Sequence, residues 1–219
     1  MSRLHTLRAS VADVAETFGA DPVLGLVVPD ETVEGLPGLV VHEANGCRRL
    51  RSMTWGFPRL TKEMRANGDA PGRVGMVADL TNPMWEQMVV DPRYRSLIPI
   101  THFANPDGDA GSKTRTWFSV KDRPIVAWAG FCRNIPEQEP VYAGMTMEAN
   151  EAIPPTNDRM PVLLDPEDHD LWLHGSIQDV IRFMFRPPFE ASRFDVIRTE
   201  DAWRSGEGPP GTQPQMALL

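Results

Sequence analysis

Short strand-forming segments joined by turn-forming residues fill the middle of this chain, and helix signals gather toward its two ends. The clearest strand pair has residues 39–41 and 50–53 as its arms, with the dipeptide Asn45-Gly46 between them. Asn-Gly readily adopts the positive φ angles of a tight hairpin turn, so this segment is predicted to be a β-hairpin. A second hairpin is predicted from residues 116–120 and 125–129, with its turn over 121–124.

Helix-capping residues mark the predicted helices. Ser10 precedes an apolar run with Asp13 three residues later, and Gly19 is placed to end that helix. Residues 165–168 (DPED) are predicted to cap one short helix, and Ser176 is predicted to begin another. Strands in the middle with helices at both ends favour an α+β domain, in which a curled, barrel-like antiparallel sheet is flanked by short helices.

The length of the chain and its last residues set the predicted domain boundaries. A chain of 219 residues is long enough for one domain with a sizeable core. Residues 194–197 are predicted to be a strand that closes the sheet, so the domain is predicted to cover residues 1–203. The remaining residues, 204–219, have the Gly- and Pro-rich composition of a linker and are predicted to be a disordered tail.

Charge and cysteine content limit the classes of function. A formal net charge of −8 argues against a protein that coats nucleic acid through its overall charge. A local basic cluster is still present, and it fits either a binding surface or an ordinary solvated face. Its members are Arg48, Arg49, Arg51, Arg59, Lys62, Arg65 and Arg73. With 2 cysteines, no signal-peptide pattern and no apolar run of about 18 residues, we expect a cytoplasmic protein without a membrane partner.

No residue pattern points to a metal or a cofactor. The 5 histidines lack the spacing of a metal site, and His169 and His174 lie beside a capped helix, where surface positions are more usual. Neither a glycine-rich phosphate loop nor a G-x-S-x-G motif is present.

The most specific segment covers residues 146–162. It reads TMEAN, then EAIPP, then TNDRMPV. It resembles the T-x-x-A-N … I-H-D-R-M-P-V signature of the SOS-response-associated peptidase (SRAP) family, with the same spacing throughout.

Four further blocks in the same order extend the resemblance. They are 53–58 (MTWGFP), 95–103 (RSLIPITHF), 127–131 (AWAGF) and 165–173 (DPEDHDLWL). They resemble the family's R-W-G-L-x-P, R-C-L-x-P-A-D-G-F-Y-E-W, F-A-G-L-W and P-P-E-D-Y-x-x-W-L blocks. The resemblance covers about residues 50–173, while the first fifty residues match only loosely.

The resemblance implies a covalent chemistry on DNA. Family members sense abasic sites in single-stranded DNA through a cysteine that becomes the N-terminal residue. Its α-amine, with a pKa of about 7.7 to 8, is partly neutral near pH 7 and condenses with the sugar aldehyde. The thiol then closes a durable thiazolidine ring, while an Asn, a Glu and a His orient the sugar and move protons.

This chain departs from the family at those positions. The cysteine falls on Ser2, the Glu on Asn105 and the His on Asn157, while residues 78–83 (ADLTNP) replace the family's N-A-R-x-E-T. A hydroxyl is a poorer ring-closing nucleophile than a thiol, and an amide cannot titrate near neutral pH. We therefore place the catalytic positions at Ser2, Asn105 and Asn157 and predict that they form no durable crosslink.

The resemblance is closer at the positions of the family's DNA-binding residues. Arg159 matches the arginine that faces the DNA backbone, Thr146 a threonine of the same cleft, and Trp55 the tryptophan of the W-G-L block. Arg3 lies one residue before the place of a family arginine. Arginine binds phosphate with paired donors and aromatic faces stack on unpaired bases. The alternative is that Trp55 is a core residue and that Arg159 pairs with Asp158 or a helix end.

The last five residues, QMALL, carry a separate signal. They resemble the Q-x-x-L-[FL] motif with which bacterial replication and repair proteins bind the sliding clamp. The motif needs a glutamine anchor and two apolar side chains on a mobile tether, here Gln215, Leu218 and Leu219. Chance is the alternative, because a motif of this length is common.

Three functions stay open on the sequence. The first is a catalytically degenerate SRAP protein of the DNA-damage (SOS) response that binds single-stranded or abasic DNA at the nucleoid. The second is an active abasic-site crosslinking or lyase enzyme, because a Schiff base needs only the Ser2 amine. The third is a protein-interaction module on the same fold, which would have no DNA affinity even at low salt.

Overall fold

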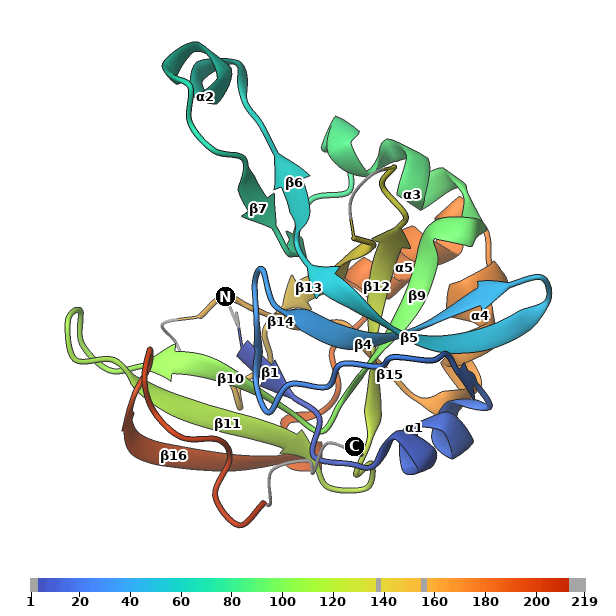
Figure 1. The fold of residues 1–219 in the computed structure, drawn as a ribbon. Helices are drawn as coiled ribbons and strands as arrows, with labels where there is room; N and C mark the ends of the chain where they lie inside the picture. The colour runs from blue at the N-terminus through green and yellow to red at the C-terminus, as the bar shows by residue number, and fades with distance from the viewer. Residues whose placement is uncertain (1–3, 137–138, 155–156, 213–219) are drawn as a thin grey trace.

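The computed structural model describes residues 4–136, 139–154 and 157–212 (Figure 1). These residues form two curved sheets, a small two-stranded arm and short helices at the periphery. The chain is therefore an α+β protein, as predicted. No helix in the described ranges has both the length and the apolar character needed to span a membrane.

The first sheet is antiparallel, with strand order β16-β11-β10-β1-β3. Its strands are β1 (Leu4–Thr6), β3 (Thr32–Val33), β10 (His102–Asp107), β11 (Thr114–Val120) and β16 (Phe194–Ala202). The strand predicted at 194–197 is thus confirmed as the beginning of β16, but β16 pairs with β11 at the edge of this sheet and does not close it.

The second sheet follows the order β14-β13-β12-β9-β4-β5-β2, with β15 paired to β12 and β8 to β13. Its strands are β2 (Asp21–Pro22), β4 (Pro37–Ala44), β5 (Cys47–Trp55), β8 (Met76–Val77), β9 (Arg95–Ile100), β12 (Val126–Arg133), β13 (Val141–Glu148), β14 (Arg159–Pro161) and β15 (Leu163–Leu164). A short parallel contact between β13 and β5, at Val141↔Thr54 and Tyr142↔Trp55, brings the two ends of the curl together. The sheet is barrel-like, but so short a contact does not make a strict barrel.

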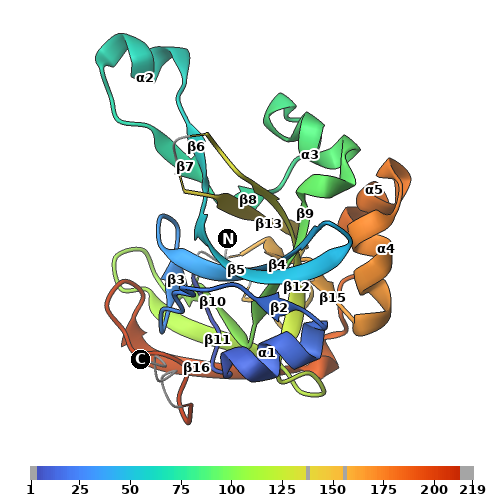
Figure 2. The same ribbon diagram turned by 45° about the vertical axis from the view of Figure 1, so that its right-hand side comes forward.

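Most of the helices lie along the outside of the sheets, while α2 (Lys62–Asn67) lies at the tip of the projecting arm (Figure 2). The other helices are α1 (Val11–Phe18), α3 (Glu86–Val90), α4 (His169–His174) and α5 (Ile177–Phe185). Single 3-10 turns are η1 (Pro83–Trp85), η2 (Pro92–Tyr94), η3 (Pro166–Asp168) and η4 (Ala191–Arg193). The predicted start and end of α1 are confirmed, with a capping box between Ser10 and Asp13 and a left-handed Gly19 at φ 56°.

The hairpin predicted around Asn45-Gly46 is confirmed. Strands β4 and β5 pair continuously from Pro37↔Thr54 to Ala44↔Cys47. Asn45 has φ 54° and Gly46 has φ 74°, the left-handed values that an Asn-Gly turn supplies at low cost.

The second predicted hairpin is wrong, although both of its strands exist. Strand β11 pairs with β10 and β16 in the first sheet, while β12 pairs with β9, β13 and β15 in the second. The segment 121–125 therefore carries the chain from one sheet to the other. A short link between two strands usually indicates a hairpin, and the sequence holds no sign of which partners each strand will choose.

The helix predicted after residues 165–168 exists, but the Asp165 side chain does not cap it. Both carboxylate oxygens of Asp165 instead accept hydrogen bonds from Arg193, at 2.9 and 2.8 Å from its Nη1 and Nη2. A paired guanidinium is a stronger partner for a carboxylate than a backbone N–H, so Asp165 serves the tertiary contact.

The segment 204–212, predicted to be part of a disordered tail, makes defined contacts in the structure. The buried Arg115 donates from Nη1 to the carbonyl of Glu207 at 2.7 Å and from Nε to the carbonyl of Trp203 at 3.2 Å. Pro209 is buried. The rest of the predicted tail, 213–219, lies outside the described residues.

Candidate functional site

Two buried amides face the junction of the two sheets. Asn105 lies in β10 opposite Thr116 of β11 and is 0% exposed. Within the described residues, neither Oδ1 nor Nδ2 of Asn105 has a hydrogen-bond partner. Asn157 lies in the loop before β14 and donates from Nδ2 to the carbonyl of Pro106 at 3.0 Å. The predicted positions Asn105 and Asn157 are thus brought together on either side of the Pro106 peptide.

Arg159 and Thr146 form the second part of the site. They lie on the neighbouring strands β14 and β13, and Arg159 Nε donates to Thr146 Oγ1 at 3.1 Å. Arg159 Nη2 also donates to the Thr146 carbonyl and, at 3.3 Å, to the carbonyl of Ala78 just after β8. Arg159 forms no ion pair with Asp158, and its Nη1 has no hydrogen-bond partner within the described residues. The arginine is therefore fixed by backbone carbonyls with one donor nitrogen left for a ligand.

The site continues toward the N-terminus of the chain. The pairing of β1 with β10 runs Thr6↔His102, His5↔Phe103 and Leu4↔Ala104, so each step toward the N-terminus advances one residue toward Asn105. The predicted residues Ser2 and Arg3 lie outside the described part of the chain. So do Gln215, Leu218 and Leu219 of the predicted clamp motif.

Trp55 has a different place from the one predicted. It is 0% exposed, stacks on Tyr142 with ring centroids 6.2 Å apart, and donates from Nε1 to the carbonyl of Gly75 at 2.8 Å. A Cβ at position 75 would lie 2.6 Å from the same indole nitrogen, so only glycine fits there. Trp55 therefore offers no open face to a base, and it holds the chain where it enters β8 and Ala78.

His5 is a buried residue that the sequence did not single out. Its Nε2 lies 3.0 Å from the Tyr142 hydroxyl, and its ring contacts Trp55 and Trp128. Burial lowers the pKa of His5 to about 3, so the imidazole is neutral at pH 7. A lone histidine in a three-residue strand gives no periodic signal, and only the tertiary packing identifies it.

A projecting arm rises next to the site (Figure 1). It consists of β6 (Phe57–Arg59), α2 and β7 (Gly72–Val74), and β7 leads through Gly75 into β8. Arg59, Lys62 and Arg65 are exposed on this arm and form no ion pair within the described residues.

The basic cluster of the sequence is thereby divided into two groups. The β5 arginines are neutralised or occupied, because Arg48 pairs with Asp170 at 2.5 Å, Arg49 pairs with Asp21 at 3.2 Å and Arg51 donates to Asn134 Oδ1 at 3.2 Å. On the arm, Arg73 donates from Nη1 to the carbonyl of Gly56 at 3.0 Å, so within the described residues the members of the cluster without a partner are Arg59, Lys62 and Arg65.

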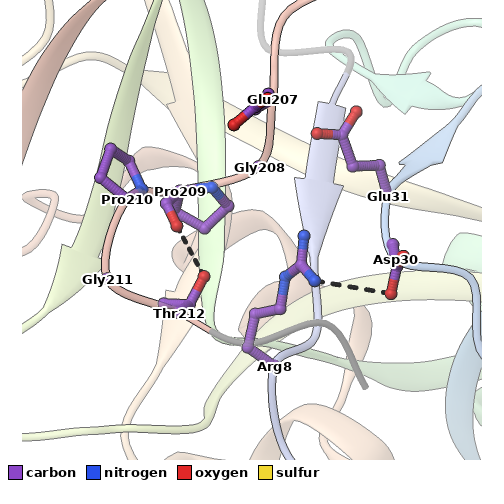
Figure 3. A pocket seen from close by; sticks show the side chains of 9 residues that line it. All are labelled: Arg8, Asp30, Glu31, Glu207, Gly208, Pro209, Pro210, Gly211 and Thr212. Carbon is purple, nitrogen blue, oxygen red and sulfur yellow. Dashed lines mark hydrogen bonds and ion pairs between the residues drawn. The ribbon is translucent and has the colours of Figure 1, made fainter. Parts of the chain in front are cut away.

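The cavity beside the C-terminal segment does not suit an anion (Figure 3). It is lined by Arg8, Asp30, Glu31 and residues 207–212. Arg8 Nη1 lies 3.5 Å from Asp30 Oδ1 and Glu31 is paired with Arg115 at 2.5 Å, so the carboxylate of Glu207 is in excess in this lining. An anion would meet excess negative charge here, so the arm and Arg159 are the better places for a negatively charged ligand.

Fold and site together define a class of protein: an α+β protein whose first strand leads to a polar site between two curved sheets. The family model described as SOS response associated peptidase (SRAP) matches residues 17–201. The chain belongs to this family, which is associated with the response to DNA damage.

Solved structures share the fold at low sequence identity. A crystal structure of a protein from Bordetella bronchiseptica is 19% identical, with a TM-score of 0.71 over 91% of this chain and 99% of that one. One from Bacteroides thetaiotaomicron is 16% identical, with a TM-score of 0.72 over 89% and 90% of the two chains. A phage-related protein from Bordetella bronchiseptica is 17% identical, with a TM-score of 0.68 over 91% and 94%. No curated protein sequence matches the chain.

Proposed function

We propose that this protein binds single-stranded or abasic DNA in the DNA-damage response and forms no durable thiazolidine crosslink with it. The observation that carries the proposal is the arm, whose three free cations project beside the site from a chain with a formal net charge of −8. Local cations of this kind attract phosphates even where the overall charge is unfavourable.

Arg159 supports the same conclusion from inside the site. Its guanidinium is held by Thr146 and by the carbonyl of Ala78, and β8 connects that carbonyl directly to the arm. A strand whose phosphates contact the arm can therefore reach Arg159 within the same binding surface. Arginine donors of this type fix the register of a backbone without reading its bases.

The chemistry available at the site argues against a durable crosslink. Amides occupy positions 105 and 157, and neither can exchange a proton near neutral pH. The family's thiol falls on Ser2, where an oxygen ring would hydrolyse readily. Imine formation through the Ser2 amine is the enzymatic alternative, and it would be detected as cleavage of abasic DNA.

The binding part of the proposal is tested by fluorescence anisotropy with labelled single-stranded DNA over a range of salt concentrations. We expect affinity to fall steeply as salt rises. Replacing Arg59, Lys62 and Arg65 with alanine should lower the magnitude of the log Kd against log salt slope by about 2, at roughly 0.7 per lost phosphate contact.

The matched control removes three exposed cations elsewhere, Arg93, Lys121 and Arg182, by the same substitution. That variant has the same net charge and should keep the slope. Absence of binding at low salt would reject the proposal and favour a protein-interaction module. Equal slopes in the two triple variants would reject the role of the arm.

The C-terminal motif adds a proposed partner, the sliding clamp. The last described residue, Thr212, lies at the surface beside Arg8, so the segment that follows begins at an accessible point. Binding of the purified protein to a bacterial clamp should be lost in a variant with Gln215, Leu218 and Leu219 all changed to alanine. Unchanged binding, or none in the wild type, would reject the partner.

A further inference from the structure

A second cavity, of about 430 Å³, lies on the side of the first sheet that faces away from the main core. Leu4, which lines it, belongs with Ala104 and Trp117 to a small apolar cluster separate from the main one. The neighbouring residues Phe103 and Phe118 point into the main core instead, as the alternation along a strand requires. The cavity is therefore distinct from the site that contains Asn105.

The wall of this cavity is an aromatic side chain. Trp203 follows β16 and packs with Ile197 on the small cluster, while its own surface stays partly exposed. The other five tryptophans, Trp55, Trp85, Trp117, Trp128 and Trp172, are at most 2% exposed. The backbone of Trp203 is held on both sides, because its N–H donates to the carbonyl of Lys113 at 2.8 Å and its carbonyl accepts from Arg115 Nε at 3.2 Å.

Exposed apolar side chains complete the lining. Val33 is 39% exposed and Leu36 is 45% exposed, and both lie in the same cavity as Trp203. An aromatic face with aliphatic neighbours is the surface on which an unpaired base stacks, whatever its sequence.

Two glutamates and two arginines line the cavity, and among the described residues Arg204 is the arginine of the two that forms no ion pair. Glu31 is paired with Arg115 at 2.5 Å, and Glu34 Oε1 accepts a hydrogen bond from the Gly75 N–H at 2.8 Å. Arg204 is exposed and forms no ion pair within the described residues. The free arginine next to the aromatic face matches the phosphate that accompanies every base.

The position of the cavity connects it to the proposed DNA surface. Leu4 is the first described residue of β1, which runs beside Ala104, the neighbour of Asn105. On the other side, Glu34 contacts Gly75, the residue between the arm and β8. The cavity thus lies between the N-terminal strand and the base of the arm.

We propose that this cavity takes one unpaired nucleobase of the bound single strand, stacked on Trp203, with the adjoining phosphate on Arg204. This inference rests on the proposed function and adds a base-binding subsite to it. Because stacking needs an exposed base, the subsite favours single-stranded over double-stranded DNA.

Tryptophan fluorescence tests the proposal in the intact protein, because Trp203 is the one tryptophan that solvent reaches. Titration with oligodeoxythymidine should change the emission and protect it from acrylamide quenching, while a duplex of equal length should do neither. Trp203→Leu should abolish both effects and weaken single-strand binding by about 5- to 100-fold, the range for loss of one stacked base. Trp203→Phe should restore most of the affinity, which separates stacking from a folding defect.

Anisotropy in the same titrations distinguishes the possible failures. If the wild type binds the oligonucleotide but Trp203 stays accessible to acrylamide and Trp203→Leu binds equally well, the subsite is wrong while the proposed function stands. If the wild type does not bind, both are wrong.

Discussion

At the scale of single residues, Asn105 is the most informative side chain of the site. An amide that is 0% exposed and has no partner within the described residues costs folding free energy. Asn157, two residues before Arg159, differs because its amide does have a partner, the carbonyl of Pro106. A buried polar group without a partner is typical of a site that awaits a ligand, so we expect stability and binding to oppose each other at Asn105.

Substitution of each asparagine by leucine makes this expectation measurable. Asn105→Leu should raise the free energy of unfolding by about 1–2 kcal/mol, since it removes an unsatisfied amide of similar size. Asn157→Leu, the matched control, should lower it by about 1–2 kcal/mol, because it deletes a formed hydrogen bond. Urea denaturation gives both values, and a loss of stability in Asn105→Leu would show that its amide is satisfied in solution.

His5 gives a prediction about acid stability. Burial lowers its pKa to about 3, below the 6.5 of the unfolded chain. The unfolded state therefore binds the extra proton first, so the contribution of His5 is complete above pH 6.5 and is lost as the pH falls toward 3. The free energy of unfolding should fall by up to about 1.4 kcal/mol per pH unit from this group in that window.

The contribution of His5 is isolated by comparing the wild type with His5→Gln in urea titrations from pH 7 to pH 4. His102, whose pKa burial lowers to about 4, adds to the acid sensitivity of both proteins and cancels in the difference. As the pH falls, the free energy of unfolding of His5→Gln should decline less steeply than that of the wild type. The difference in slope should correspond to at most one bound proton, about 1.4 kcal/mol per pH unit. Parallel curves would contradict the buried, neutral state of His5.

At the scale of elements, ion pairs connect the start of β16 to the helical layer. Arg193 contacts Asp165 at 2.8 Å and Asp122 at 3.1 Å, and its guanidinium lies 3.9 Å from the ring centre of Phe189. The Arg193 guanidinium holds the pKa of Asp165 below its usual value. One side chain thus joins η4, the segment between β11 and β12, and the start of η3.

Replacement of Arg193 by alanine should therefore lower the free energy of unfolding by about 1–2 kcal/mol, since the pair is mostly shielded from water. Arg182→Ala is the control, because Arg182 is 71% exposed and its ion pair within the described part of the chain is with Asp179 of its own helix. Its effect should stay within about 0.5 kcal/mol. Thermal unfolding of the two variants side by side checks the difference, and equal melting temperatures would contradict it.

The same scale shows what the sequence could and could not predict. Local signals were reliable: Asn45-Gly46 forms its turn, and Ser10 and Ser176 both begin helices with capping boxes. The pairing partners of the strands could not be predicted in this way, because β11 and β12 are adjacent in the chain and yet belong to different sheets. Asp165 illustrates the same limit, since its cap pattern is local while Arg193, its real partner, lies 28 residues away.

The candidate site was predictable only in part. The family motifs located Asn105, Asn157, Thr146 and Arg159, which form two pairs in the structure. Asn157 donates to the carbonyl of Pro106 next to Asn105, and Arg159 donates to Thr146. Burial of Trp55 was not predictable, because the same aromatic residue suits a core and a stacking surface equally well. The separation of the arm cations from the other residues of the basic cluster could not be predicted from the sequence either.

At the scale of the whole molecule, residues of both sheets contribute to the proposed binding surface. Asn105 belongs to the first sheet, whereas Thr146 and Arg159 belong to the second, and the arm connects β5 to β8 of the second sheet. The chain thus has the family's fold, and the resemblance of its motifs assigns Ser2, Asn105 and Asn157 to the positions of the family's thiol, carboxylate and imidazole. DNA binding by the surface and covalent capture by the N-terminal residue are separate properties, and we predict that this protein has the first alone.

The most direct measurement of that claim is a denaturing gel of the protein, with its native N-terminus, after incubation with single-stranded DNA that carries one abasic site. We predict intact free DNA and no heat-stable protein–DNA band, under conditions where anisotropy reports binding. Cleaved DNA that disappears when the Ser2 amine is blocked would instead identify a lyase. A heat-stable band would contradict the account and mean that another group has replaced the missing cysteine.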